Sequence, residues 1–516
     1  MSFNLTQERW IPVVTHDWQR QEVSLIELFN NLDKYREIQA DNPPTTLALH
    51  RFLIAILHRA YNGPRDEDHW EEIRDDRGQK AIEYLKQHFD KFDLFHPEYP
   101  FMQDILIESD AAGEIYQAAQ IHGNNTSTVF CHEHQWSQAK ISISEGARLL
   151  LRLQIFDVGG KKAGATDSAG VIHTMGAANI LVRGENLQDT LMLNLMQYDP
   201  DGDIPATFNG EDLPSWERPL FPPVNRIPSG YIDHLTYQYR RCRIFLEDEN
   251  VVRAASHPGD KLPRDLSAQT WECGIPYVKN PKGSFPLRLN LDRSLWRDSA
   301  VFLQSSDSST RPRILDWVAD LEAGDLIEEV VHLQILGLTV DNAKPLGWTN
   351  AQFSAPIIYL TNRDLWSSLS KVLKIAEEHQ QVFRSFKGSP YHALAETLKN
   401  GDAGKLAGTL NGESRYWATL DREFQILLAK LPEDKMIDAN GTTYGIKELP
   451  LWTKTVQQSA RRAFTDSIES IRNYEARAKA LKSLESQLAK LRGDKDEKKT
   501  KKTSKKDPVD KQLTLL

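Results

Sequence analysis

The chain has 516 residues, a length at which proteins usually divide into more than one domain. Its mean hydropathy is -0.51 and no apolar run reaches about 18 residues, so no membrane-spanning helix is predicted. The net charge of -9 argues against a uniformly basic nucleic-acid binder, although a surface of this size has room for local basic patches.

The first 362 residues mix short apolar runs with Pro, Gly and a few helical patterns. Apolar residues recur near the helical period in Thr46–Tyr61, and Glu22–Tyr35 is a second helix candidate. Leu149–Phe156 is apolar almost throughout and is interpreted as a buried strand, followed by a glycine-rich loop over residues 157–164. These patterns predict an irregular α+β domain over residues 1–362. Further strands are expected within Ser229–Leu246 and Pro286–Leu291.

Strand patterns almost vanish after residue 362, and four amphipathic segments follow. The last of them is the longest, and its final four leucines are spaced three and four residues apart, as on a helix packed against neighbours. The segments predict a four-helix bundle over residues 363–491. Residues 492–516 are Lys-rich and poor in apolar side chains, which predicts a disordered tail. The four segments are Arg363–Phe386, Tyr391–Lys399, Arg415–Leu431 and Lys454–Leu491.

The case for catalysis is weak along the whole chain, which contains neither G-x-S-x-G nor H-E-x-x-H. The most enzyme-like group is His122 with the run Cys131–His134, whose side chains are metal-ligand types at a spacing that fits no zinc pattern. A polar loop with ordinary histidines is the plain interpretation. A metal-dependent hydrolase using His122, His132 and His134 is the alternative. We expect no enzyme activity, cofactor or metal.

The compartment is inferred from the cysteines and from the start of the chain. Three cysteines, far apart and odd in number, predict no disulfide framework and fit a reducing cytoplasm. The first residues lack a basic region followed by an apolar stretch, so no secretory signal is expected.

Gly159 and Gly160, followed by Lys161, come directly after the predicted buried strand. They lack the G-x-x-x-x-G-K-[ST] pattern of a nucleotide-binding loop. Glycines beside lysines suit close approach to a DNA backbone, since glycine admits a near contact and lysine neutralises phosphate. A surface turn explains the same residues equally well, and the two interpretations stay open at this point.

Three short motifs, in this order and ahead of a helical C-terminal region, resemble the CasA family, the large subunit of the type I-E CRISPR surveillance complex called Cascade. The resemblance covers the chain to about residue 490 and is loose over residues 205–340. The motifs are Arg9–Val13 (RWIPV), His96–Gln103 (HPEYPFMQ) and Leu181–Asn194 (LVRGENLQDTLMLN).

This resemblance implies a non-catalytic subunit at one end of a complex guided by CRISPR RNA (crRNA). The crRNA reads the target sequence, and the subunit reads the short protospacer-adjacent motif (PAM) in double-stranded DNA, mainly from the minor groove. It then promotes strand separation and helps recruit a helicase-nuclease. Its partners would be the other Cascade subunits with crRNA, target duplex DNA and that nuclease. A purely structural scaffold subunit is a further alternative.

The resemblance also carries roles to individual residues. Gly159 and Gly160, with Lys161, match a glycine loop that faces the PAM, and Lys279 or Lys282 matches a lysine that enters the minor groove. Asp341–Lys344 resembles a hairpin that wedges beneath the PAM, so Asn342, Ala343 and Lys344 are its expected tip, with Gln352 available under a different alignment. Asn125 and Phe130 match a loop that docks near the crRNA 5′ end.

Overall fold

The computed structural model forms two compact units, described separately here. The first contains Met1–Leu291 and Val301–Thr361, and the second contains Asp292–Ala300 and the chain from Asn362 onward. The structure describes residues 2–119, 139–162, 164–165, 167–219, 225–263, 266–291, 293–341, 344–399, 401–433, 435–437, 443–446 and 448–491.

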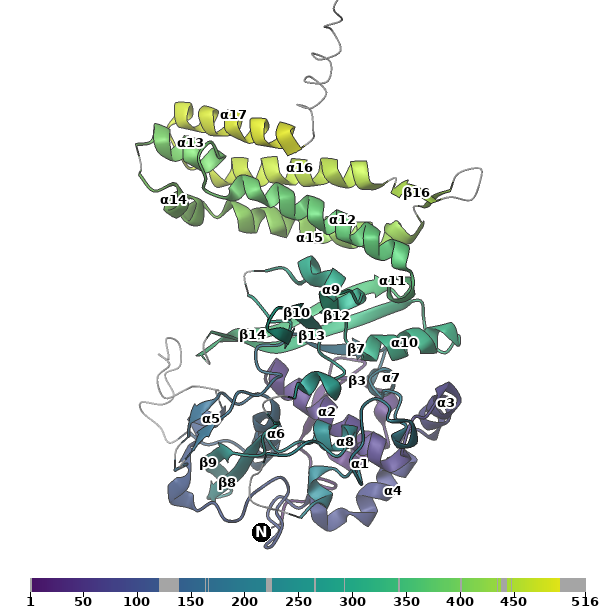
Figure 1. Ribbon diagram of the computed structural model, residues 1–516. Helices are drawn as coiled ribbons and strands as arrows, with labels where there is room; N and C mark the ends of the chain where they lie inside the picture. The colour runs from purple at the N-terminus through teal and green to yellow at the C-terminus, as the bar shows by residue number, and fades with distance from the viewer. Residues whose placement is uncertain are drawn as a thin grey trace, which may run out of the picture. The chain divides into compact units, whose positions relative to one another are not determined.

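Helix α2 (Pro43–Tyr61) forms the centre of the first unit and confirms the helix expected over residues 46–61. The side chain of Asn42 accepts a hydrogen bond from Thr45 N (2.9 Å) and caps the helix, and prolines occupy its first turn, where their missing N–H groups cost nothing. Most residues of α2 are buried, because α6, α8 and strand β13 surround it (Figure 1). It therefore supplies core to the whole unit.

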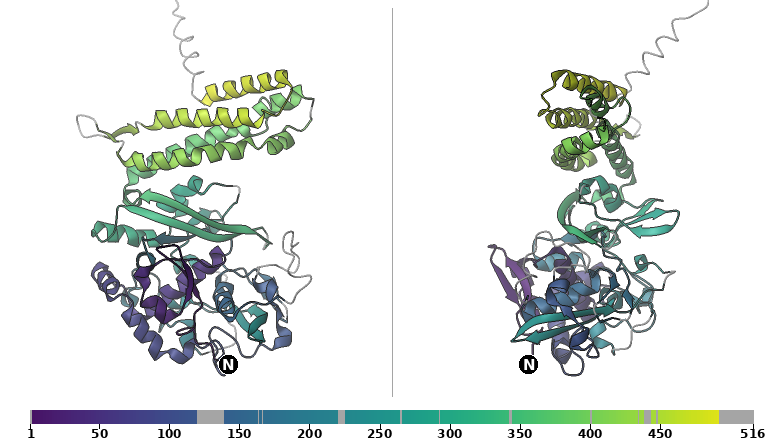
Figure 2. Two further views of the ribbon diagram at one scale, coloured as in Figure 1. Left: turned by 180° about the vertical axis from the view of Figure 1, so that it is seen from behind. Right: turned by 90° about the vertical axis from the view of Figure 1, so that its left-hand side faces the viewer.

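The longest strands of the first unit form one antiparallel hairpin, β13 (Val330–Asp341) with β14 (Lys344–Pro356). Strand β7 (Asn179–Arg183) pairs with the other side of β13, which gives the order β14-β13-β7. The two long strands lie side by side in the left view of Figure 2. The register pairs Asp341 with Lys344, so the hairpin turns over residues 342–343. We call β13 and β14 the long hairpin.

Other short elements complete the first unit. The expected helix over residues 22–35 is confirmed only at Leu25–Phe29, with a strand before it. The helices are α1 (Leu25–Phe29), α3 (Glu67–Asp76), α4 (Gln79–Gln87), α5 (Ile115–Ala119), α7 (Leu187–Leu193), α8 (Tyr231–Leu235), α9 (Ser299–Leu303, which crosses into this unit), α10 (Ile314–Ala323) and α11 (Ile358–Thr361), and the strands are β1 (Ile11–Thr15), β2 (Arg20–Val23), β3 (Tyr35–Ile38), β4 (Gly113–Glu114), β5 (Gly160–Lys161), β6 (Ser168–Ala169), β8 (Arg240–Glu247), β9 (Asn250–Pro258), β10 (Tyr277–Asn280), β11 (Gly283–Pro286) and β12 (Ser309–Thr310).

The strand expected over Leu149–Phe156 is wrong, because this run lies in helix α6 (Ile143–Ile155). The helix begins at a capping box, in which Ser142 Oγ accepts from Glu145 N (3.2 Å) and the Glu145 carboxylate accepts from Ser142 N (2.7 Å). Glu145, Arg148 and Arg152 recur three and four residues apart, which is helical spacing, but the apolar run over residues 149–156 contains only the last of them. The capping box lies upstream of the apolar run, and it is the sequence feature that would have indicated a helix.

The second unit is helical, with one small strand pair, β15 (Lys435–Ile437) and β16 (Thr443–Ile446). Helix α15 packs on α16, α12 on α16, and α13 on α17. The described residues after Asn362 hold six helices, so the predicted bundle of four is not confirmed in that form. They are α12 (Arg363–Gln380), α13 (Pro390–Thr397), α14 (Ala403–Leu410), α15 (Gly412–Lys430), α16 (Glu448–Ser467) and α17 (Tyr474–Leu491).

The long helix expected over residues 454–491 is two helices. Helix α16 ends at Ser467, and α17 begins at Tyr474, where the side chain of Asn473 accepts a hydrogen bond from Ala476 N (3.0 Å). An Asn in this role marks a new helix start. The break lets α17 pack on α13, whereas α16 packs on α12 and α15.

Residues 292–300 leave the first unit and pack on the helices of the second. The Trp296 ring stacks on Phe424 (ring centroids 4.5 Å apart), and the Arg297 guanidinium lies 3.7 Å from the centre of the Trp417 ring. Arg297 also donates two hydrogen bonds to the Glu377 carboxylate (2.9 and 3.0 Å). The sequence patterns gave no sign of this excursion.

None of the helices in the described part of the chain is long and apolar enough to cross a membrane. The mixed architecture of helices and sheets, with helices after residue 362, agrees with the predicted α+β fold.

Candidate nucleic-acid interface

The glycine loop over residues 157–164 lies between α6 and β6 and presents an open backbone at Gly160. Gly160 has φ +112°, a conformation that side-chain-bearing residues rarely adopt, and a Cβ placed there would meet no atom within 4 Å. Gly159 is tighter, since its Cβ would come within 3.2 Å of the Ala169 carbonyl oxygen. Lys161 is exposed in β5 and forms no ion pair with the described residues. A ligand backbone could therefore approach at Gly160.

A buried ionic cluster holds this loop in place through Asp157 and Lys162. The Asp157 carboxylate accepts hydrogen bonds from Lys162 Nζ (2.7 Å), Arg240 Nε (2.6 Å) and Ser256 Oγ (2.6 Å). Burial by itself would raise the pKa of Asp157, but the Lys162 and Arg240 cations hold it below the ordinary value. Arg240 also donates to the carbonyl oxygens of Asp157 and Gly170 (3.0 and 2.8 Å). Of the two neighbouring lysines, Lys162 is thus structural, whereas Lys161 has no ion-pair partner in the described part of the chain.

Strands β10 and β11 form a second hairpin, which carries both predicted minor-groove lysines and is called the lysine hairpin. Lys279 lies in β10, and Lys282 lies in the turn, where its backbone N–H donates to Asn280 Oδ1 (2.8 Å). Both side chains are exposed, and neither forms an ion pair with residues in the described part of the chain. Gly283 completes the turn with φ +133°. Two uncompensated cations therefore project from one small hairpin.

The long hairpin presents its turn at the position predicted for the wedge. Asp341 and Lys344 are its last paired residues, while Asn342, Ala343 and the side chain of Lys344 lie outside the described residues. Gln352, the alternative, is exposed in the middle of β14 opposite Gln334, away from the turn.

One connecting segment, Ile172–Ala178, joins all three of these elements. It follows the glycine loop in the chain, and the N–H of its last residue donates to Leu287 O (2.9 Å), just beyond the lysine hairpin. Leu289 N in turn donates to Gly176 O (2.9 Å). A Cβ at Gly176 would lie 3.0 Å from the Val340 side chain, next to the turn of the long hairpin. The connecting segment thus contacts the chain just beyond the lysine hairpin and the end of β13, and it follows the glycine loop in the sequence.

Several other predicted residues cannot be compared with the structure. Asn125 and Phe130 of the docking loop, and His122, His132 and His134 of the alternative metal site, lie outside the described residues.

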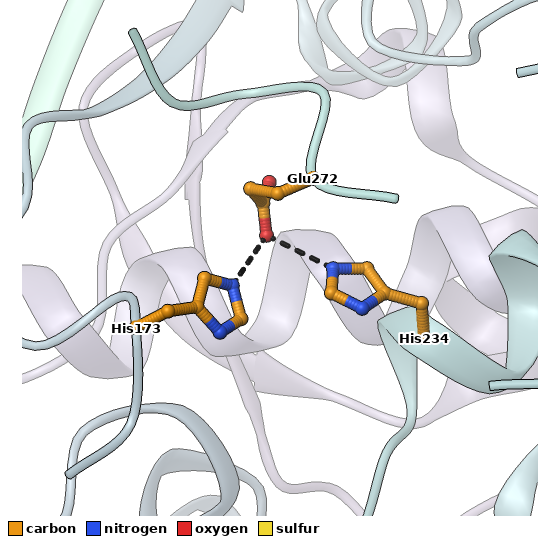
Figure 3. Close-up of side chains that lie close together, drawn as sticks. All are labelled: His173, His234 and Glu272. Atoms are coloured by element: carbon orange, nitrogen blue, oxygen red, sulfur yellow. Dashed lines mark hydrogen bonds and ion pairs between the residues drawn. The ribbon is translucent and has the colours of Figure 1, made fainter. Parts of the chain in front are cut away.

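Sequence inspection missed a cluster in which His173 of the connecting segment lies beside His234 and Glu272 (Figure 3). Glu272 Oε2 lies 3.0 Å from His173 Nε2 and 3.2 Å from His234 Nε2. These residues come from three separate loops and short helices, with no motif spacing, so only the fold reveals them. Two imidazoles and a carboxylate are ligand types for a transition metal.

The surroundings of Glu272 favour an ionic network over a metal centre. Arg51 Nη1 lies 2.9 and 3.1 Å from its two carboxylate oxygens, and Gly274 N donates to Oε1 (3.1 Å). The carboxylate is therefore already surrounded by donors and neutralised by a buried cation, which would also repel a metal ion. Burial lowers the pKa of His234 to about 4, so this imidazole is neutral. The cluster anchors His173, and with it the connecting segment.

Comparison with known proteins gives consistent results. The model of the family described as CRISPR-associated protein Cse1 matches residues 4–463. A CRISPR-associated protein CasA/Cse1 of Thermus thermophilus is 29% identical over 462 residues, which cover 84% of this chain and 89% of that protein. The crystal structure of Thermobifida fusca Cse1 has a TM-score of 0.77 at 25% identity and covers 95% of this chain and 98% of its own. A chain of a CRISPR RNA-guided surveillance complex shares the fold at 19% identity, with a TM-score of 0.67 and coverage of 94% and 99%.

Proposed function

The chain belongs to the Cse1 family of CRISPR-associated proteins, and from this we propose that it is the large, non-catalytic subunit of a crRNA-guided surveillance complex that recognises the PAM in double-stranded DNA. In this role it reads the PAM mainly from the minor groove, promotes strand separation and helps recruit a helicase-nuclease. Asn125 and Phe130 dock it near the crRNA 5′ end. The first unit recognises DNA.

The main support for this proposal is that the segment Ile172–Ala178, which follows the glycine loop in the chain, contacts both the residues just beyond the lysine hairpin and the end of β13 in the long hairpin. An open glycine backbone lets a DNA strand approach closely, and exposed lysines without carboxylate partners supply affinity for phosphate. A lysine on a narrow hairpin can enter a minor groove about 6 Å wide, whose degenerate pattern suits a reader that accepts several PAMs. The sequence of the DNA target itself is read by the crRNA.

Replacing Gly160 with Asp tests the proposal at the glycine loop. The side chain would occupy the open space above Gly160, and its charge would repel phosphate, so the assembled complex should lose at least tenfold in affinity for PAM-containing duplex. Titration of fluorescent duplexes with and without the PAM measures this loss. Because the φ of Gly160 disfavours any side chain, some loss of stability is also expected.

Gly210→Asp is the matched control, since Gly210 has φ +87° and a Cβ there would likewise meet no atom within 4 Å. It lies outside the glycine loop and both hairpins and should bear the same backbone strain without a loss of PAM binding. Equal loss of thermal stability in both variants, with PAM discrimination intact in both, would mean that Gly160 is only a structural turn.

Replacing Asn342, Ala343 and Lys344 together with glycine tests the wedge. Opening the first base step costs on the order of a few kcal/mol, which an inserted rigid tip must offset, and Pro345 restricts the backbone of Lys344. The variant should therefore unwind linear targets more slowly than wild type while binding the intact duplex almost as well. Targets with mismatched strands beside the PAM should restore the rate, as followed by a fluorescent base at the first step.

The two-residue turn of another hairpin provides the control for this test. Asp248 and Glu249 join β8 to β9, are exposed and have φ +48° and +61°. Glycine at both positions should leave unwinding unchanged. If the tip variant and wild type open intact and mismatched targets at equal rates, the wedge lies elsewhere and Gln352 becomes the next residue to test.

A further inference from the structure

Arg288 lies across the connecting segment, just beyond the lysine hairpin. Its backbone pairs with Ala177, and its Nη1 donates to the carbonyl oxygen of Met175. A Cβ at Gly176, which has φ +73°, would come within 2.8 Å of that Nη1. Glycine at position 176 therefore lets the guanidinium lie directly on the backbone. The remaining N–H groups of the guanidinium are held in a fixed direction.

Among the described residues, none pairs its charge with that of Arg288. Arg51 and Arg240, the two arginines of the ionic clusters beneath the site, each contact a carboxylate (2.9 and 2.6 Å). Arg288 is exposed and forms no ion pair with the residues that the structure describes. Partial desolvation against the connecting segment lowers its pKa below the ordinary value, and no nearby carboxylate opposes this. An anion bound beside the guanidinium would favour its charged form and raise its pKa toward the ordinary value.

We infer that Arg288 binds a backbone phosphate of the duplex beside the PAM and so sets the position of the DNA between the glycine loop and the turn of the long hairpin. This inference rests on the proposed function. A phosphate is the fitting ligand because the guanidinium fork binds two of its oxygens, and because a donor fixed at the backbone is suited to positioning the duplex. Arg288 is thus a positioning residue, and the PAM bases are read by other groups.

The test measures how affinity for PAM-containing duplex depends on salt in the assembled complex. Removing one phosphate contact should reduce the slope of log K against log salt by about 0.9. Arg288→Gln should show this reduction, bind about tenfold more weakly at low salt and keep its preference for the PAM over other duplexes. Arg288→Lys should keep the wild-type slope, because it retains the charge.

Arg20→Gln is the control for the simple loss of a positive charge. Arg20 is exposed on β2 and also forms no ion pair with residues of the described part. Its replacement should change neither the slope nor the affinity. Thermal unfolding of Arg20→Gln should match wild type, whereas a small loss of stability is expected for the Arg288 variants, because they lose the hydrogen bond to the Met175 carbonyl oxygen.

The outcomes separate this inference from the proposed function. If the salt slope of Arg288→Gln equals that of wild type, the inferred phosphate contact is wrong, whether or not the variant is less stable. The proposed function still holds in that case if the wild-type complex discriminates the PAM. A wild-type complex that binds duplexes without PAM preference overturns the proposed function, while a reduced slope in Arg288→Gln still supports the contact. A wild-type complex that binds no duplex overturns both.

Discussion

Replacing Glu272 with Ala should lower the free energy of unfolding by about 3–5 kcal/mol, because it leaves a buried charge without its partner. The Arg51 guanidinium would lose both of its carboxylate contacts (2.9 and 3.1 Å), and the two imidazoles of His173 and His234 would lose their acceptor. Glu272 and Arg51 are both buried, so water cannot readily take over these interactions. Urea denaturation at pH 7 measures the loss.

Two further variants identify the cause. Glu211→Ala removes an exposed glutamate that lies 4.0 Å from Arg59, and it should change stability by less than about 0.5 kcal/mol. Replacing Arg51 and Glu272 together with Met should recover part of the loss, since no buried charge is then left unpaired. The ionic interpretation is contradicted if Glu272→Ala is as stable as wild type, or if a chelator destabilises the wild-type protein.

Acid should destabilise the protein strongly between about pH 6.5 and pH 4. Burial lowers the pKa of three histidines, His50, His58 and His234, from the ordinary 6.5 to about 4. Below pH 6.5 each takes up a proton in the unfolded chain but not in the folded protein, so stability falls by about 1.4 kcal/mol per pH unit for each histidine until pH 4. Glu272 adds to the loss below about pH 4.5, because its pKa is held well below the ordinary value in the fold.

The contribution of one histidine can be isolated at His58. Its Nδ1 lies 2.8 Å from the carbonyl oxygen of Gly63, and the ring is fully buried. His58→Asn keeps an N–H donor near the position of Nδ1 and cannot titrate. The variant should be less stable at pH 7. Between pH 6.5 and 4 its stability should fall less steeply than that of wild type, because its unfolding takes up about one proton fewer. A pH slope equal to that of wild type would mean that His58 is not a source of acid lability.

Local sequence patterns correctly predicted those elements whose apolar spacing and capping residues lie close together in the sequence. The helix over residues 46–61 has apolar side chains at the helical period and a capping Asn at its start, and the structure confirms it. Helix α6 was mistaken for a strand because the apolar run over residues 149–156 leaves out Glu145 and Arg148, which together with Arg152 show the helical spacing. The break in the helix expected over residues 454–491 also had a local sign, because Asn473 caps the start of α17.

Some features of the candidate site could likewise be predicted from the sequence, and others could not. Gly160 and Lys279 were identified by resemblance to family motifs, and both are exposed in the structure. The supporting contacts were not predictable. Asp157 and Arg240 are 83 positions apart, and Arg51 and Glu272 are 221 apart, so no local pattern links them. Buried ionic pairs of this kind depend on the tertiary arrangement alone.

The excursion of residues 292–300 into the second unit has a consequence for synthesis on the ribosome. Trp296 stacks on Phe424, which is 128 positions later in the chain (424 minus 296). At 5–20 residues per second, about 6 to 26 s pass between the addition of these two residues. During that time the indole has been made but its partner has not, while the chain returns to complete the first unit through Thr361. The nascent protein therefore exposes a large aromatic side chain of the kind that chaperones bind.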